Sequence, residues 1–153
     1  MRIDLTTLAA LLGGKLTDPS RGAAQVANIR SLEGAGPGEL AFLWDPRFAG
    51  AAESSRAEAI VAIGGGRVLD AGKAAADSSG VPCLLVPTSP ATCSGATAVV
   101  VDYDPSGGYL GSRRTAEPPA AAVVDTRVLA AAPDRLLVAG LVDALAKSVE
   151  VLS

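Results

Sequence analysis

The sequence predicts an α/β fold: a layered, mainly parallel β-sheet flanked by helices, with a helix at the C-terminal end. Two apolar runs at residues 60–63 and 81–86 support this prediction, because short unbroken runs are typical of strands buried on both faces of a parallel sheet. The first run ends in Gly64, Gly65 and Gly66, and apolar residues at helical spacing follow it. The order strand, glycine turn, helix, strand indicates a parallel sheet.

Short elements are expected before residue 57. Asp4 or Thr6 is placed to cap a leucine-rich helix that Gly13 and Gly14 end. Residues 15–17 and 26–31 are expected to form short strands around a turn at residues 18–20.

A loop of turn residues at 34–38 precedes an apolar strand at residues 40–44. Pro46 suits the first turn of a helix that runs to Arg56. No linker composition separates this helix from the apolar run at residues 60–63, so we expect one continuous sheet in a single domain, residues 1–153.

Further elements are expected beyond the glycine-led helix and the strand at residues 81–86. Residues 98–103 and 121–125 predict two more strands. Residues 104–119 are rich in Gly, Pro and Ser and predict a loop, with a ragged hairpin around Gly107 and Gly108 as the alternative. Pro133 and Asp134 open the last helix.

The last helix is expected to be amphipathic. Its aliphatic stripe has spacings of four and three residues and comprises Val138, Val142, Leu145, Val149 and Leu152. We expect this stripe to pack on the sheet. The opposite side comprises Gly140, Asp143, Lys147 and Glu150. Leu137, Leu141 and Val151 lie outside the stripe, and an exposed apolar flank predicts a homo-oligomer formed through residues 137–151.

Composition limits the functions open to the chain. An apolar content of 49% argues against disorder, and a net charge of −3 argues against nucleic acid as a partner. No apolar run approaches the roughly 18–20 residues of a membrane span, and the first residues lack a signal-peptide core. Cys83 and Cys93 have no metal-type spacing and are interpreted as reduced thiols of a cytoplasmic protein. Histidine is absent, which removes the commonest general base and zinc ligand.

The glycine turn is a candidate anion site. Glycine can take positive φ and lets another molecule approach the backbone closely, and the unpaired amide groups and dipole of the following helix attract anions. Nucleotide pyrophosphate is the natural candidate for this anion. However, Leu69 stands where the usual dinucleotide fingerprint has a third glycine or alanine. The alternative is a tight strand-to-helix turn without a ligand.

Residues 63–73, Ile-Gly-Gly-Gly-Arg-Val-Leu-Asp-Ala-Gly-Lys, carry a family resemblance. They resemble the GGG-[KRS]-xx-D-xx-K segment of the glycerol dehydrogenase group within the iron-type alcohol dehydrogenase superfamily. The likeness continues in register through residues 81–88, 123–126 and 132–146, and covers residues 57–153. It implies a Rossmann-like domain that binds NAD. The residues that would line the cofactor are Gly64, Gly65, Gly66, Thr88, Thr92, Thr97 and Tyr103.

The resemblance also implies an incomplete enzyme without catalytic residues of its own. The family's Ser-Thr-Asp becomes Ala91-Thr92-Cys93, so the acidic residue that orients the polyol substrate is lost. Cys93 is either a small core residue or a modest nucleophile. Asp143 matches the family's single aspartate metal ligand, while the other two ligands are histidines beyond Ser153. The alternative for Asp143 is a solvated face, and no bound metal is expected because one carboxylate cannot build a zinc site.

Residues 1–56 carry a different resemblance, through Leu8–Gly14 and the stretch Ser31–Phe48. They resemble the uridine-binding N-terminal domain of UDP-3-O-acylglucosamine N-acyltransferase, a family that makes lipid A precursors. This resemblance implies a uracil site at Phe42, Asp45 and Phe48. An ionised Asp45 can only accept hydrogen bonds, whereas the family's asparagine also donates. The alternative is a strand–loop–helix corner packed on the two phenylalanines.

Three functional hypotheses follow. The first is an incomplete nicotinamide-cofactor-binding domain of a glycerol or polyol dehydrogenase, inactive alone, joined to a uridine-domain-like segment. The second is a UDP-sugar-binding module of an N-acyltransferase that lacks its catalytic β-helix. The third is a recombined or designed α/β domain without a ligand. The expected small-molecule partner is therefore a dinucleotide or a UDP-sugar.

Overall fold

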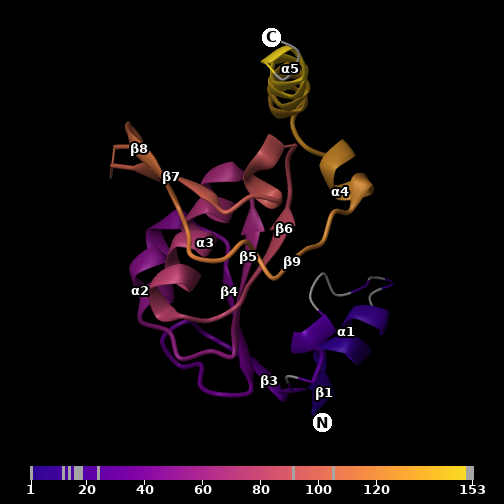
Figure 1. Cartoon of the computed structure of the whole chain (residues 1–153), viewed down its shortest axis with the longest axis vertical. Coiled ribbons are helices and arrows are strands. Elements are labelled where there is room, and N and C mark those ends of the chain that lie inside the picture. The colour runs from indigo at the N-terminus through magenta and orange to yellow at the C-terminus, as the bar shows by residue number, and fades with distance from the viewer. Residues whose placement is uncertain are drawn as a thin grey trace.

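The computed structural model describes residues 2–11, 13, 15, 19–23, 25–90, 92–104 and 106–150. Figure 1 shows the arrangement of their helices and strands, with α1 and α5 at opposite ends of the molecule. The order of elements is β1 (Ile3–Asp4), α1 (Leu5–Leu11), η1 (Pro19–Arg21), β2 (Gln25–Val26), β3 (Asn28–Arg30), β4 (Glu39–Leu43), η2 (Pro46–Phe48), α2 (Ala49–Glu53), β5 (Ala59–Gly64), α3 (Gly66–Ser79), β6 (Cys83–Pro87), η3 (Thr92–Gly95), β7 (Val99–Tyr103), β8 (Tyr109–Arg114), β9 (Ala121–Ala122), α4 (Thr126–Ala130) and α5 (Asp134–Glu150).

A five-stranded parallel sheet forms the centre of the chain, with strand order β3-β4-β5-β6-β9. In the register of the central strands, Ala41 lies beside Ile60 and Ile60 lies beside Cys83. Helices α2 and α3 lie on one side of the sheet (Figure 1). The predicted α/β class is therefore confirmed. The main sheet continues across the junction near residue 57 as predicted, but β1–β2 and β7–β8 form two separate two-stranded sheets.

The larger hydrophobic cluster lies between the sheet and helices α2 and α3. Alternate residues of the central strands point into it, including Leu43 of β4, Ile60 of β5 and Leu85 of β6, each fully buried. Leu69 of α3 packs into the same cluster and is also fully buried. The period of two along each strand and the helical period of α3 thus meet in one core.

The opposite face of the sheet is only partly covered. Leu5 of α1 is buried there against Leu40 and Val61. Other apolar side chains of this face are half-buried, namely Phe42, Ile63, Leu84 and Val86. The expectation that the strands are buried on both faces therefore holds fully only for the face beneath α2 and α3.

Helix α1 begins as the sequence predicts. The Asp4 carboxylate accepts hydrogen bonds from the Thr7 backbone N–H and hydroxyl, each at 2.7 Å. These bonds lower the pKa of Asp4 below its ordinary value, because they stabilise the ionised form. The strand expected at residues 26–31 is instead divided: β2 pairs antiparallel with β1, and β3 joins the main sheet. Leu16 and Thr17 of the other predicted strand lie outside the described residues.

The helix expected from Pro46 to Arg56 is shorter and divided. A 3-10 turn, η2, is followed by α2, which ends at Glu53. Asp45 fixes the start, because its side chain accepts a hydrogen bond from the Arg47 backbone N–H at 2.9 Å.

The region expected to be a loop at residues 104–119 contains a strand. β7 and β8 form an antiparallel hairpin, so the hairpin alternative is confirmed. Gly107 has φ +91°, a conformation that favours glycine and allows the chain to reverse. β9 is shorter than the predicted strand at residues 121–125, because Asp125 caps α4 by accepting from the Arg127 backbone N–H at 2.8 Å. Helix α4 is not among the predicted elements.

The last helix is present, but the prediction of its packing is wrong. Val138, Val142 and Leu145 of the expected sheet-facing stripe are 60%, 60% and 67% exposed. Helix α5 stands beyond one end of the sheet (Figure 1) and packs through its opposite side, where Gly140 is buried. A Cβ atom on Gly140 would overlap the carbonyl oxygen of Pro90, so the absence of a side chain permits this close contact. Leu152 and Val151 lie outside the described residues.

Candidate functional site

The glycine turn lies at the C-terminal end of the central strand β5. Gly65 precedes the first residue of α3, and its carbonyl oxygen accepts from the N–H groups of Val68 and Leu69 at 2.9 and 3.1 Å. The amide groups of Gly66 and Arg67 belong to the first turn of the helix and have no intrahelical acceptor. Together with the helix dipole, these groups make the turn suited to bind an anion.

The glycines provide space rather than an unusual backbone conformation. Gly65 has φ −79° and ψ −180°, an extended conformation that any residue adopts, so the expected use of positive φ is not observed there. A Cβ atom on Gly64 would lie 2.7 Å from Cβ of Val68. A Cβ atom on Gly65 would lie 3.2 Å from the hydroxyl oxygen of Ser89. Gly64 therefore allows α3 to turn tightly, and Gly65 keeps the backbone accessible.

The chain after β6 lies beside the glycine turn. The Thr88 backbone N–H donates to the Gly64 carbonyl at 2.9 Å, which joins two of the predicted cofactor-binding residues. Ser89 is 7% exposed and lies with its hydroxyl close to Gly65. Ser89 is not among the predicted site residues, although its position directly after Thr88 and before Pro90 at the end of a buried strand was a usable signal.

Two further predicted cofactor-binding residues, Thr92 and Thr97, lie in and just after η3, which contacts α3. Thr92 begins η3, but its side chain lies outside the described part of the structure. Thr97 has a buried hydroxyl oxygen with no hydrogen-bond partner among the described atoms. A buried polar group without a partner is costly, so the Thr97 hydroxyl is a candidate for contact with a ligand.

Tyr103 is separate from the other predicted cofactor-binding residues. The guanidinium carbon of Arg67 lies 4.9 Å from the centre of its ring, in cation–π geometry. Both residues line a hollow of about 490 Å³ together with Arg47 and Asp104. Tyr103 thus lies near the start of α3, but it faces a different hollow from the one beside Gly66.

The hollow beside Gly66 brings the glycine turn together with α5. Its volume is about 330 Å³, and its lining includes Ser89, Pro90, Gly140 and Asp143. The Asp143 carboxylate accepts from the Lys147 ammonium at 2.9 Å, which confirms the favourable spacing of four residues. Asp143 is partly buried, so the solvated-face alternative holds only in part.

The metal hypothesis for Asp143 gains no support from its surroundings. Among the described residues, no group of three or more His, Cys, Asp and Glu side chains is placed to hold a metal ion. The sequence contains no histidine, and a lone carboxylate does not make a zinc site. Asp143 can contribute at most one ligand.

The three residues of the uracil hypothesis have other contacts. The Asp45 carboxylate is bound by its neighbour Arg47, whose Nη2 donates at 2.6 Å. These bonds hold the pKa of Asp45 below its ordinary value. Phe42 packs against the partly covered face of the sheet, and the ring of Phe48 lies 5.8 Å from that of Trp44. This arrangement agrees with the strand–loop–helix corner.

Cys83 is a free thiol in the larger hydrophobic cluster. Burial raises its pKa to about 12, because the charged thiolate loses its hydration there. Cys83 is therefore a core residue rather than a nucleophile. The side chain of Cys93 lies outside the described part of the chain.

Comparison with known proteins identifies the family. The model for "Iron-containing alcohol dehydrogenase" matches residues 41–133, which include the glycine turn, α3 and all of β5 to α4. The chain belongs to the iron-containing alcohol dehydrogenase family. The family match confirms the resemblance carried by residues 63–73.

Relatives in the iron-containing alcohol dehydrogenase family include a glycerol dehydrogenase of Escherichia coli O6:H1, 41% identical over 100 residues, covering 65% of this chain and 27% of that protein. A "Glycerol-1-phosphate dehydrogenase [NAD(P)+]" of Methanocorpusculum labreanum is 31% identical, covering 93% of this chain and 39% of that protein. The structure of a probable glycerol dehydrogenase from Sinorhizobium meliloti 1021 has a TM-score of 0.60 at 36% identity, covering 65% of this chain and 28% of that one. This chain thus spans about a quarter to two fifths of the length of these three relatives.

These comparisons do not support the second resemblance. The iron-containing alcohol dehydrogenase match begins at residue 41, within the segment that resembles the acyltransferase. The Methanocorpusculum labreanum protein aligns with 93% of the chain, so that alignment includes most of residues 1–56. The hypotheses of an acyltransferase segment and of a chimera therefore remain without support. No helix within the described residues has the length and hydropathy needed to cross a membrane.

Proposed function

We propose that this chain is part of the nicotinamide-cofactor-binding domain of a glycerol or polyol dehydrogenase, and that the glycine turn binds the pyrophosphate of NAD. The observation that carries the proposal is the glycine turn at the head of α3, on the C-terminal edge of a parallel sheet. Ligands of open α/β sheets bind at this edge, and helix N-termini favour phosphate groups.

Two features of the described chain are compatible with a dinucleotide. Gly65 leaves the backbone open to close approach, and the Thr97 hydroxyl is buried without a partner among the described atoms. The family match and a relative whose name includes NAD(P)+ support the same ligand class. The proposed cofactor contacts are Gly64, Gly65, Gly66, Thr88, Thr92 and Thr97, with Tyr103 as an outlying member.

We expect cofactor binding without turnover by this chain alone. Cys93 stands at the position of the family's polyol-orienting acidic residue, and Asp143 is the single matching metal-ligand position in a sequence without histidine. The proposed assignment is therefore a binding domain and not a complete enzyme.

A titration followed by protein NMR tests the proposed function. NADH should shift the amide resonances of Gly65, Gly66 and Ser89, because these groups surround the proposed pyrophosphate site. UDP-N-acetylglucosamine serves as the comparison ligand and should leave them unchanged. Shifts at Phe42, Asp45 and Phe48 with the UDP-sugar, and none with NADH, would favour the acyltransferase alternative instead.

The variant Gly65→Val should weaken NADH binding at least about tenfold, equivalent to about 1.4 kcal/mol. The added side chain would lie against Ser89 and occupy space that the phosphate needs. Stability should change little, because the backbone of Gly65 is already extended. Isothermal titration calorimetry measures the affinity. Gly50→Val is the matched control, because a Cβ at Gly50 meets no atom within 4 Å; equal affinities for all three proteins would contradict the assignment.

We propose that residues 137–151 form a contact between copies, because apolar side chains of α5 are exposed both in the stripe and on the flank beside it. Leu141 and Leu145 are 68% and 67% exposed on this helix. Burial of such side chains stabilises an association by about 1.5–3 kcal/mol each. Light scattering at high micromolar concentration should therefore detect a dimer or larger species, which Leu141→Glu should dissociate. A monomer under these conditions would contradict the proposed contact between copies.

A further inference from the structure

An ion pair is buried in α3, with Asp70 about one turn and Lys73 about two turns after Gly66. Asp70 and Lys73 are 4% and 3% exposed, and the Lys73 ammonium lies 2.9 Å from Oδ1 of Asp70. Charged groups are rarely buried so deeply unless other groups satisfy their hydrogen-bonding capacity. The partners of Lys73 therefore indicate why the pair is there.

Lys73 also binds the chain that leads into β7. Its ammonium donates to the carbonyl oxygen of Thr97 at 3.4 Å and to the carbonyl oxygen of Val99. The ammonium group thus donates to two carbonyl oxygens, while its contact with Asp70 is an ion pair, because Oδ1 of Asp70 has no hydrogen-bond partner among the described atoms. Asp70 thus orients Lys73, and Lys73 holds two carbonyl groups of one short segment.

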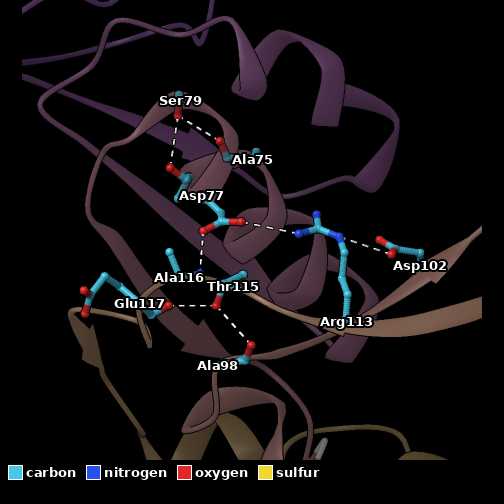
Figure 2. Close-up of polar contacts among 10 residues, drawn as sticks. Ala75, Asp77, Ser79, Ala98, Asp102, Arg113, Thr115, Ala116 and Glu117 are labelled. Atoms are coloured by element: carbon cyan, nitrogen blue, oxygen red, sulfur yellow. Dashed lines mark hydrogen bonds and ion pairs between the residues drawn. The ribbon is translucent and has the colours of Figure 1, made fainter.

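The intervening carbonyl group is held by a different residue. Thr115 donates to the Ala98 carbonyl oxygen from its backbone N–H at 2.8 Å and from its hydroxyl at 3.0 Å. Figure 2 shows the hydroxyl contact and, beside it, Asp77 of α3, which accepts from the Ala116 backbone N–H at 2.8 Å. Three consecutive carbonyl groups, at residues 97 to 99, are therefore fixed by hydrogen bonds.

The segment that is fixed in this way carries the partnerless Thr97 hydroxyl. Its oxygen is buried and has no hydrogen-bond partner among the described atoms. The backbone at Thr97 cannot shift easily to bring the hydroxyl to a hydrogen-bond partner, because Lys73 and Thr115 bind the carbonyl groups of residues 97–99. A fixed, unsatisfied hydroxyl is suited to an incoming ligand, since binding then replaces a missing hydrogen bond.

We propose that Lys73, oriented by Asp70, is a positioning residue for the dinucleotide: it holds the backbone at residues 97–99 so that the Thr97 hydroxyl meets a cofactor bound at the glycine turn. The inference rests on the proposed function. Helix α3 links the two parts, because its N-terminus supplies the amide groups and its middle supplies Lys73. A distortion of the backbone at residue 97 should therefore lower the affinity for the cofactor without altering the glycine turn.

The test uses the double variant Asp70→Leu/Lys73→Met, which removes both charges and leaves neither of them buried alone. We expect its NADH affinity to fall about three- to tenfold, the loss of one hydrogen bond. The NADH-induced NMR shift at Thr97 should disappear, while those at Gly65 and Gly66 persist. The control is Asp77→Asn, which weakens the other attachment between α3 and the hairpin and should bind NADH as the unaltered protein does.

A second variant keeps the proposal testable if the double variant does not fold. Thr97→Val has the same shape and removes the buried hydroxyl, so it should be at least as stable as the unaltered protein. It should also bind NADH about three- to tenfold more weakly. Unchanged affinity in Thr97→Val, or in a folded double variant, would overturn the positioning role while leaving the proposed function intact. Absence of NADH binding to the unaltered protein would overturn the proposed function itself, and the positioning role with it.

Discussion

Asp70→Leu alone is expected to lower the free energy of unfolding by about 3–5 kcal/mol, because it leaves the Lys73 ammonium buried without its counter-charge. The two side chains are almost fully excluded from solvent, so water cannot replace the lost carboxylate. Urea denaturation followed by circular dichroism measures the change. For a domain of this size, such a loss is a large part of the total stability.

Asp77→Leu is the matched control on the same helix. Asp77 lies 3.4 Å from Arg113 in a partly exposed ion pair and also accepts one backbone hydrogen bond. Its loss should cost about 1 kcal/mol, because solvent compensates partly exposed charges. The double variant Asp70→Leu/Lys73→Met should recover most of the stability lost by Asp70→Leu. Equal losses for Asp70→Leu and Asp77→Leu would show that burial of the pair does not determine its energetic effect.

The variant Gly72→Val is expected to destabilise the protein by about 3 kcal/mol, at the upper end of the cost of inserting side-chain atoms into a packed core. A Cβ atom on Gly72 would overlap the Cβ atom of Ala62 in β5. Helix α3 would have to move away from the central strand, which would open the cluster around Leu69. Thermal or urea denaturation measures the effect.

The variants Gly72→Ala and Ala62→Gly distinguish the effect of this overlap from the effect of helix propensity at residue 72. Gly72→Ala raises intrinsic helix propensity by about 1 kcal/mol, yet we expect it to destabilise the protein because of the contact with Ala62. Adding Ala62→Gly should restore stability, since one methyl group then occupies the space between helix and strand. If Gly72→Ala is stabilising by itself, close packing is not the reason for glycine there.

The central strands and α3 could be predicted from the sequence because their signals are local. The apolar run at residues 60–63 and the helical spacing after it both arise from side chains that meet in one core. Local patterns do not reveal contacts across the chain, however. The D-xx-K spacing of Asp70 and Lys73 does not indicate that their side chains are buried. Their burial results from the segment leading into β7, which lies over them.

The packing of α5 shows a second limit. The stripe that includes Val138 and Val142 was correctly placed on one face of a helix, but periodicity alone does not say whether another element covers that face. The contact is made instead at Gly140, where the missing side chain lets the helix approach Pro90. A glycine inside a predicted helix was the available signal for close approach.

The part of the candidate site formed by neighbouring strand ends could be predicted from the sequence, whereas the parts that depend on other elements could not. Thr88 and the glycine turn lie side by side, because the carboxyl ends of β5 and β6 meet at one edge of the sheet. Ser89 could have been inferred from its position directly after Thr88, whereas the hollow that it shares with Asp143 depends on how α5 is placed, which no local pattern reveals. Tyr103 faces another hollow because Arg67 stacks on its ring.

The two outer strands of the main sheet bear on the tendency of the protein to aggregate. An outer strand exposes unpaired backbone groups that can recruit a strand from another molecule. Here the outer strands are only three and two residues long, Asn28–Arg30 and Ala121–Ala122. The first carries Arg30, paired with Glu39 at 3.2 Å, so a charged side chain flanks the open edge. Short and charged edges hinder the addition of a strand from another molecule, so we expect little edge-to-edge association at β3 and β9.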